Sequence, residues 1–235
     1  MAQPTAQQPA SENELTGKRI LLTNATSGNG PAIAGALTAA GAMVLTQVSQ
    51  EDHSPAPLLN SQQKLIQTTI DSPESARALW EGIEHEVIDV VVLNSACMPR
   101  ASVTDTDSEW DAAWQEVWSS NVVGPSALMK AAVAHFLGNG GGVFITVSDC
   151  SPNISQMESD LFAYGASIAA IESVTKTIAR NYAAANILAH IVAPDHHTTT
   201  TTPDQVGRIT TFLAAGKARH LSGATFDMNS GTFIK

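Results

Sequence analysis

The sequence of 235 residues lacks several features that mark broad classes of protein. No stretch approaches the roughly 18 uninterrupted apolar residues of a membrane-spanning helix. Residues 1–14 have neither the basic start nor the apolar centre of a signal peptide. Only two cysteines are present, Cys97 and Cys150, which gives no disulfide framework and suits a reducing compartment. We therefore expect a cytoplasmic protein with no membrane partner.

Positive charge is also scarce. Lys and Arg together number 12 against 22 Asp and Glu, and the formal net charge is −10. Binding to nucleic acid or to an anionic membrane surface requires a basic face, so neither is expected as a partner. Because the acidic residues are spread along the chain, we interpret them as a solubility feature.

What the sequence does contain is a regular alternation of strand and helix patterns. Residues 1–14 are interpreted as a polar, flexible extension and residues 15–235 as one domain. Short apolar runs predict strands at 18–23, 42–48, 64–69, 88–93, 143–147, 187–193 and 225–228. Helical patterns lie between them at 31–40, 72 to about 86, 108–137, 164 to about 185, and 203–213. Strands alternating with helices indicate a doubly wound parallel α/β sheet.

One segment carries the strongest chemical signal. Ser148 ends the strand at 143–147, and Tyr164 opens the next helix sixteen residues later. This layout resembles the catalytic segment of the short-chain dehydrogenase/reductase family, a strand-end serine followed by Tyr-x-x-x-Lys. The resemblance extends over about residues 17–231 and implies a Rossmann-type fold, NAD(P) binding and hydride transfer. It also implies that Asn121 is the helix asparagine that organises a water molecule and the proton path.

The turn after the first strand resembles the family's Thr-Gly-x-x-x-Gly-x-Gly motif, with Asn24 at the first glycine position. Such a loop can hold a pyrophosphate on helix N–H groups, although a tight turn without a ligand is the alternative interpretation. Asn tolerates the left-handed conformation better than most residues, so we expect the turn to survive. The residues implied as cofactor contacts are Asn24, Ser27, Gly28, Gly30, Asn94 and Ala96.

Several positions depart from the family pattern. Ile168 stands where the family keeps its lysine, and Val48 ends a strand that carries neither the acid nor the base expected near the adenosine ribose. The segment from Asp195 to Pro203 is too short for the usual substrate lid. These departures together predict that NAD(P) binds weakly or not at all.

The loss of the lysine bears directly on Tyr164. A free phenol has a pKa near 10 and is a poor base at neutral pH, and the family lysine lowers that pKa through its charge. Lys176 lies 12 residues later, about 18 Å along the helix axis, and cannot replace it. We expect Tyr164 to donate a hydrogen bond rather than abstract a proton.

The serine itself is open to two assignments. The spacing from Gly141 selects Ser148, whereas the family's serine-to-tyrosine interval of about 13 selects Ser151. We prefer Ser148 and interpret the surplus as an insertion in the loop 150–162.

Two other groups of residues allow a functional interpretation. Adjacent histidines such as His196 and His197 rarely converge on one ion, so no metal site is predicted. The residues Trp110, Trp114 and Trp118 recur every four positions, which indicates a packed helix face, with a partner surface as second interpretation.

The leading hypothesis is a non-catalytic or redox-impaired subunit that assembles, as a homo- or hetero-oligomer, with subunits of the same fold. The alternative is an active enzyme that uses Ser148 and Tyr164 on a small-molecule or carrier-bound substrate. It would be an NAD(P)-dependent reductase or alcohol dehydrogenase, or a lyase, isomerase or cyclase.

Overall fold

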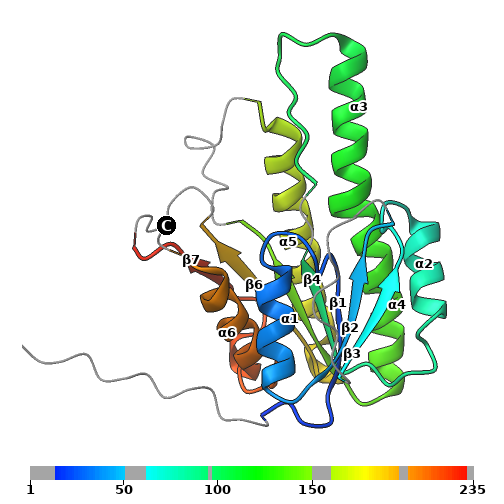
Figure 1. The fold of residues 1–235 in the computed structure, drawn as a ribbon, viewed down its shortest axis with the longest axis vertical. Helices are drawn as coiled ribbons and strands as arrows, with labels where there is room; N and C mark the ends of the chain where they lie inside the picture. Colours follow the sequence, from blue (N-terminus) through cyan, green and yellow to red (C-terminus); the bar gives the residue numbers. More distant parts are fainter. Residues whose placement is uncertain (1–13, 51–61, 95–96, 150–159, 196–200, 232–235) are drawn as a thin grey trace, which may run out of the picture.

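A computed structural model describes residues 14–50, 62–94, 97–149, 160–195 and 201–231 (Figure 1). Its strands are β1 (Arg19–Leu22), β2 (Met43–Val48), β3 (Gln63–Gln67), β4 (Val90–Asn94), β5 (Gly142–Val147), β6 (Ile187–Pro194) and β7 (Thr225–Met228). Its α-helices are α1 (Gly30–Ala39), α2 (Pro73–Glu81), α3 (Asp107–Trp118), α4 (Gly124–Gly138), α5 (Phe162–Tyr182) and α6 (Pro203–Ala214). A π-helical turn, Ser119–Val123, joins α3 to α4, and short 3-10 turns occupy Ala183–Ala185 and Arg219–Leu221.

The seven strands form one parallel sheet in the order β3-β2-β1-β4-β5-β6-β7. Helices α1 and α6 pack together on one face, and α2, α4 and α5 cover the other (Figure 1). The chain is therefore a single-domain, Rossmann-like α/β fold, which confirms the predicted fold class.

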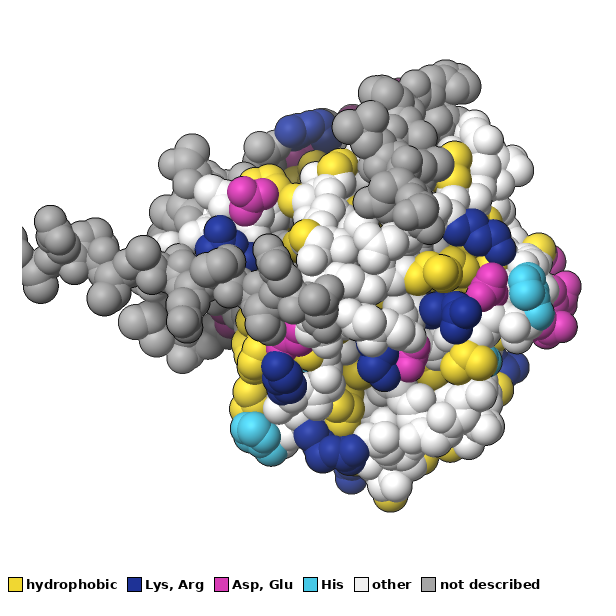
Figure 2. All heavy atoms as spheres, turned by 60° about the horizontal axis from the view of Figure 1, so that its bottom comes forward, with side chains coloured by type: hydrophobic (Ala, Val, Ile, Leu, Met, Phe, Trp, Pro, Cys, Tyr) yellow, Lys and Arg dark blue, Asp and Glu magenta, His cyan; other side chains and the backbone are white. Residues whose placement is uncertain are grey.

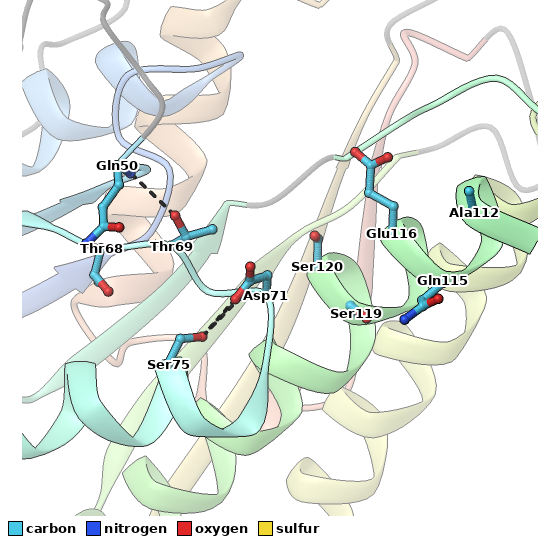
Figure 3. Close-up of a pocket in the computed structure, with 10 residues that line it drawn as sticks. All are labelled: Gln50, Thr68, Thr69, Asp71, Ser75, Ala112, Gln115, Glu116, Ser119 and Ser120. Carbon is cyan, nitrogen blue, oxygen red and sulfur yellow. Dashed lines mark hydrogen bonds between the residues drawn. The ribbon is translucent and has the colours of Figure 1, made fainter. Parts of the chain in front are cut away.

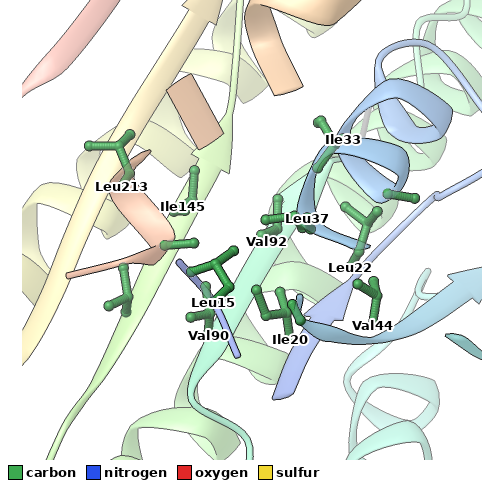
Figure 4. Close-up of a cluster of buried hydrophobic side chains, with 14 of the residues drawn as sticks. Leu15, Ile20, Leu22, Ile33, Leu37, Val44, Val90, Val92, Ile145 and Leu213 are labelled. Atoms are coloured by element: carbon green, nitrogen blue, oxygen red, sulfur yellow. The ribbon is translucent and has the colours of Figure 1, made fainter. Parts of the chain in front are cut away.

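Both faces of the sheet are buried, which explains the continuous apolar runs in the sequence. Ile20 and Leu22 of β1 point into the core beneath α1 and α6, where Leu15 is also fully buried (Figure 4). Leu21, between them, points into the opposite core. There the rings of Phe136 and Phe144 meet edge to face, with centroids 5.0 Å apart.

The helix ends follow local signals. The Ser72 hydroxyl accepts from the backbone N–H of Ser75 at 3.1 Å and so caps the start of α2. That helix ends at Glu81 rather than near Glu86, with Gly82 at its C-cap.

Helix α3 rises beyond the carboxyl ends of the strands, beside the start of α5 (Figure 1). The ring of Trp110 lies 5.7 Å from that of Trp114 and 5.8 Å from that of Phe162. Trp118 is 40% exposed. The tryptophan face is therefore only partly packed, on the first turn of α5.

The opposite end of the molecule carries lysine and arginine side chains next to acidic ones (Figure 2). Lys18 pairs with Asp89 at 2.8 Å, and Glu86 pairs with Arg19 at 3.1 Å and with Lys64 at 3.5 Å. These ion pairs tie the amino ends of β1 and β3 to the segment that precedes β4. Within the described segments, no helix is both long and apolar enough to cross a bilayer.

Candidate active site

The turn between β1 and α1 adopts the conformation that its sequence allows. Asn24 has φ +46° and Gly28 has φ +55°, so both lie in the left-handed region. This agrees with the expectation that Asn24 can replace a glycine there. A Cβ at Gly30 would lie 2.4 Å from the carbonyl oxygen of Asn24, so only glycine fits. The backbone of the turn therefore packs directly against Gly30, the first residue of α1.

Asn94, at the end of β4, holds this turn in place. Its Nδ2 donates to the carbonyl oxygen of Asn24 at 2.9 Å and to that of Ser27 at 3.3 Å. The structure therefore brings Asn24, Ser27, Gly30 and Asn94 together. The last predicted cofactor contact, Ala96, lies outside the described residues.

A further residue, Gln47, supports the same turn and was missed by sequence reasoning. It lies fully buried in β2, and its Oε1 accepts from the backbone N–H of Asn24 at 2.9 Å. Its Nε2 donates to the carbonyl oxygen of Thr68 after β3. A polar residue within an otherwise buried strand was the available signal.

Asn121 lies in the π-helical turn, a feature frequent at functional sites. Its Oδ1 accepts from the backbone N–H of Cys97 at 2.9 Å, and its Nδ2 donates to the Cys97 carbonyl at 2.8 Å and to Ser167 Oγ at 3.0 Å. Ser167 Oγ in turn donates to the carbonyl oxygen of Tyr164 at 2.7 Å. Asn121 therefore connects the segment after β4 to the first turns of α5.

The structure does not pair Ser148 with Tyr164 as the sequence led us to expect. The Ser148 hydroxyl donates to Glu172 Oε1 at 2.7 Å. The Tyr164 hydroxyl instead donates to Asp149 Oδ2 at 3.2 Å. Both residues follow the end of β5 and contact α5, but Ser148 reaches Glu172, two turns further along the helix, whereas Asp149 reaches Tyr164. The rival candidate Ser151 lies outside the described residues.

The environment of Tyr164 favours its protonated form. The side chain is only 4% exposed, and it packs with Leu161 and Ile168. Burial first, and then the charge and hydrogen bond of Asp149, raise the pKa of Tyr164 well above its usual value. Among the described residues, no cation offsets this rise.

Lys176 is engaged elsewhere on α5. Its Nζ lies 3.4 Å from Glu172 Oε2, and the other oxygen of Glu172 accepts from Ser148. This agrees with the expectation that Lys176 cannot serve Tyr164. The linked side chains of Ser148, Glu172 and Lys176 instead connect the end of β5 to the middle of α5.

In the described part of the chain, no group of three or more His, Cys, Asp or Glu side chains is arranged to hold a metal ion. His196 and His197 lie outside it. Helix α6 begins at Pro203, nine positions after β6 ends at Pro194. Residues 196–200 of this connection, where the lid was expected to be missing, are also outside the described residues.

The sequence from Lys18 to Gly207 matches the family model described as short chain dehydrogenase. This chain is a member of the short-chain dehydrogenase family. It is 30% identical to 2-dehydro-3-deoxy-D-gluconate 5-dehydrogenase of Bacillus subtilis, over 80% of this chain and 74% of the relative. It is 25% identical to 3-oxoacyl-acyl-carrier-protein reductase FabG of Vibrio cholerae, over 94% of this chain and 99% of that one.

Solved structures of short-chain dehydrogenases share the fold. A short-chain type dehydrogenase/reductase from Mycobacterium marinum aligns with TM-score 0.81 and 24% identity, covering 94% of this chain and 97% of that one. A gluconate 5-dehydrogenase from Burkholderia cenocepacia, solved in complex with NADP and tartrate, aligns with TM-score 0.79 and 20% identity over the same shares.

The dinucleotide that the short-chain dehydrogenase family uses fits one part of this site and not another. The turn at Asn24–Gly30 precedes α1 and leaves open space at the Cα of Gly28, as a pyrophosphate requires. At the other end, Ile168 provides no donor, and Lys176 is bound to Glu172. The described residues thus keep the open turn before α1 and place no positive side chain beside the tyrosine.

Proposed function

We propose that this short-chain dehydrogenase is a redox-impaired member that acts, in the cytoplasm, as a subunit of an assembly with catalytic chains of the same fold. The observation that carries the proposal is the hydrogen bond from the buried Tyr164 hydroxyl to Asp149, with Ile168 packed beside the ring. Carbonyl reduction by this fold needs a tyrosine that can release and regain its proton.

The electrostatics oppose that proton exchange. A general acid–base group works best with a pKa near the operating pH. Both burial and Asp149 move the pKa of Tyr164 in the opposite direction. The phenol therefore remains a hydrogen-bond donor, and the Asp149 carboxylate beside it disfavours the negative charge that develops on a reacting carbonyl oxygen.

The absence of a lysine at position 168 also supports weak or absent NAD(P) binding. In this chain Ile168 takes the place of the ribose-holding lysine that the family resemblance implies, and Val48 ends β2 without an acid or base for the second ribose. Gln47 occupies a backbone N–H of the phosphate turn. Of the contacts that the cofactor would need, only the N-terminal end of α1, where an anion can bind, then remains.

An apolar groove between α4 and α5 supports the assembly. The groove encloses about 540 Å³, and its apolar lining includes Met129, Val133, Leu137, Val174 and Ile178. Leu137 is 53% exposed. Exposed apolar grooves of this kind are typical of protein–protein contacts.

Calorimetric titration with NAD(H) and NADP(H) tests the cofactor side of the proposal. We expect no binding by the wild type or by Ile168→Lys, since the new lysine would pair with Asp149. Only Asp149→Ser combined with Ile168→Lys should gain binding, and Ala169→Lys, which adds the same charge at an exposed position, should not. Micromolar binding and turnover by the wild type would overturn the proposal.

The assembly side is tested by co-expression with catalytic family members and by size-exclusion chromatography. Leu137→Glu should release the subunit from its partner, because it buries a charge in the groove. Leu221→Glu is the matched control, because Leu221 is 38% exposed and lies outside the groove. A stable monomer that binds no other chain of this fold would contradict an assembly role.

A second candidate is an active dehydrogenase or reductase, or a non-redox lyase, isomerase or cyclase. The intact turn at Gly28 and Gly30 favours it, as does the retention of Tyr164 and Asn121. The similar proteins act, by their names, on 2-dehydro-3-deoxy-D-gluconate and on 3-oxoacyl groups of acyl-carrier protein. Turnover of such a sugar acid or carrier-bound acyl group that is abolished by Tyr164→Phe would establish this candidate.

A further inference from the structure

The first turn of α5, which carries Tyr164, begins without a polar cap. Ser72, Thr106 and Thr202 cap α2, α3 and α6, whereas the N-cap position of α5 is taken by Leu161, whose side chain has no hydrogen-bonding atom. An apolar N-cap leaves the first backbone N–H groups without the partner that a serine, threonine, aspartate or asparagine supplies. The position of this turn therefore depends on contacts from outside the helix.

Those contacts come from residues Cys97–Ala101, which we call the strap. Arg100 Nη1 donates to Asp160 Oδ2 at 2.6 Å, and the backbone N–H of Ala101 donates to the carbonyl oxygen of Asp160 at 2.8 Å. Ala101 also forms a parallel β-bridge with Leu161. The strap thus fixes the two residues that immediately precede α5.

Leu161 is placed to cover the tyrosine. Its side chain packs with those of Tyr164 and Ile168, and Leu161 and Tyr164 are each only 4% exposed. Ala101, its partner in the bridge, is fully buried. The strap therefore determines whether Leu161 stays against the phenol.

The other end of the strap is firmly anchored. The backbone N–H and carbonyl of Cys97 both bond to the side chain of Asn121, and the Cys97 thiol donates to Glu116 Oε1 at 3.2 Å. Glu116 belongs to α3 and lines the polar cleft between α3 and the ends of β2 and β3 (Figure 3). Movement of the strap is therefore expected at Arg100 and Ala101 rather than at Cys97.

The contact between Arg100 and Asp160 is weak in a way that favours opening. The Arg100 side chain is 62% exposed, and exposed ion pairs contribute little to stability and are screened by salt. Asp160 Oδ1 is buried and forms no hydrogen bond with any described part of the chain. The closed strap thus leaves an unpaired acceptor, which water reaches once the strap opens, so closure is only slightly favoured.

We propose that the strap is a gate for Tyr164. In the closed state it holds Leu161 against the phenol and keeps solvent and substrate from the hydroxyl. When the pair between Arg100 and Asp160 separates, Leu161 is released and the hydroxyl is uncovered. Segments held by few contacts open locally without unfolding the whole protein. The gate goes beyond the proposed function, because it controls access to the hydroxyl whether or not the chain transfers hydride.

Nitration by tetranitromethane, located by peptide mass spectrometry, measures access to the phenol. The chain has two tyrosines, so the partly exposed Tyr182 serves as an internal reference. We expect Tyr164 of the wild type to react more slowly than Tyr182. Arg100→Gln should speed nitration of Tyr164 about fivefold, as expected for the loss of one exposed ion pair. Arg100→Lys keeps the charge and should keep the reaction slow.

Lys18→Gln is the matched control. It removes a second ion pair between distant segments, from Lys18 to Asp89 at 2.8 Å, at the opposite end of the molecule. Because this pair does not contact the strap, the substitution should leave nitration of Tyr164 unchanged. Raising NaCl to about 1 M should speed nitration in the wild type but not in Arg100→Gln, which has no pair left to screen.

Leu161→Ala tests the cover itself. It should speed nitration of Tyr164, and Arg100→Gln should add nothing further. The gate is overturned if Tyr164 of the wild type reacts as fast as Tyr182, if Arg100→Gln has no effect, or if Lys18→Gln has the same effect. Nitration needs no cofactor, whereas the proposed function is tested by cofactor titration and assembly, so each can fail without the other.

Discussion

His190 provides a sharp test of how the core of this protein is built. It lies in β6 opposite Ile145 of β5, it is fully buried, and the ring of Phe226 is 6.2 Å away. Neither ring nitrogen forms a hydrogen bond of normal geometry with the described residues. A buried polar group without a partner costs roughly 1–3 kcal/mol.

The perturbation is His190→Leu, which keeps a side chain of similar size and removes the unsatisfied nitrogens. We expect the free energy of unfolding at neutral pH to rise by about 1–3 kcal/mol. His135→Leu is the control. His135 Nε2 accepts from the backbone N–H of Ile88 at 3.1 Å, so the same substitution there should destabilise the protein by about 1 kcal/mol.

The pH dependence gives a second signature. Burial lowers the pKa of His190, and the backbone of Leu221 opposes this only in part. The unfolded chain, with a pKa near 6.5, then binds more protons than the folded one. Stability should be constant with respect to this group above about pH 6.5. Below it, stability should fall by up to about 1.4 kcal/mol per pH unit until the folded pKa is reached.

Urea denaturation of both variants and the wild type across this pH range measures these quantities. The stability difference between His190→Leu and the wild type should widen as the pH falls below about 6.5. The reasoning is refuted if His190→Leu is less stable than the wild type at neutral pH, or if the difference between them does not change with pH.

Two further predictions concern the site. Gly30→Ala places a Cβ 2.4 Å from the carbonyl oxygen of Asn24, so the turn must shift, and thermal denaturation should show a lower Tm. Asn121→Ala removes two partly buried hydrogen bonds to Cys97 and one buried hydrogen bond to Ser167, which should lower the free energy of unfolding by about 3 kcal/mol in urea titrations. A Tm or an unfolding free energy equal to that of the wild type would contradict the respective contact.

The strands and helices could be predicted closely from the sequence because their signals are local. The run at 225–228 matches β7, and the helix predicted at 203–213 matches α6, which begins at Pro203. The exception is α2, where apolar spacing continues beyond Gly82 although the helix has ended. Periodicity identified the elements better than it identified their ends.

The site was harder to predict because it depends on contacts between distant segments. The bond between Gln47 and Asn24 joins β2 to the turn after β1. A polar residue in a buried strand signals that a partner exists, but the local sequence does not identify that partner. The choice between Ser148 and Asp149 depends on which part of α5 each side chain reaches after β5 ends, Glu172 for Ser148 and Tyr164 for Asp149. Asp149 lies fifteen residues before Tyr164, closer to the family interval than Ser148, and this was the signal that could have found it.

On the proposed function, the contact between Tyr164 and Asp149 also constrains how the chain could gain hydride chemistry. Asp149 bonds the tyrosine hydroxyl, and Ile168 packs against the same side chain. A lysine gained at 168 alone would be captured by the carboxylate, and a serine gained at 149 alone would leave the phenol without a cation. On the proposed function, neither single mutation is expected to raise activity. Both substitutions would then be needed together, so selection that acts on one substitution at a time would not readily restore the reaction.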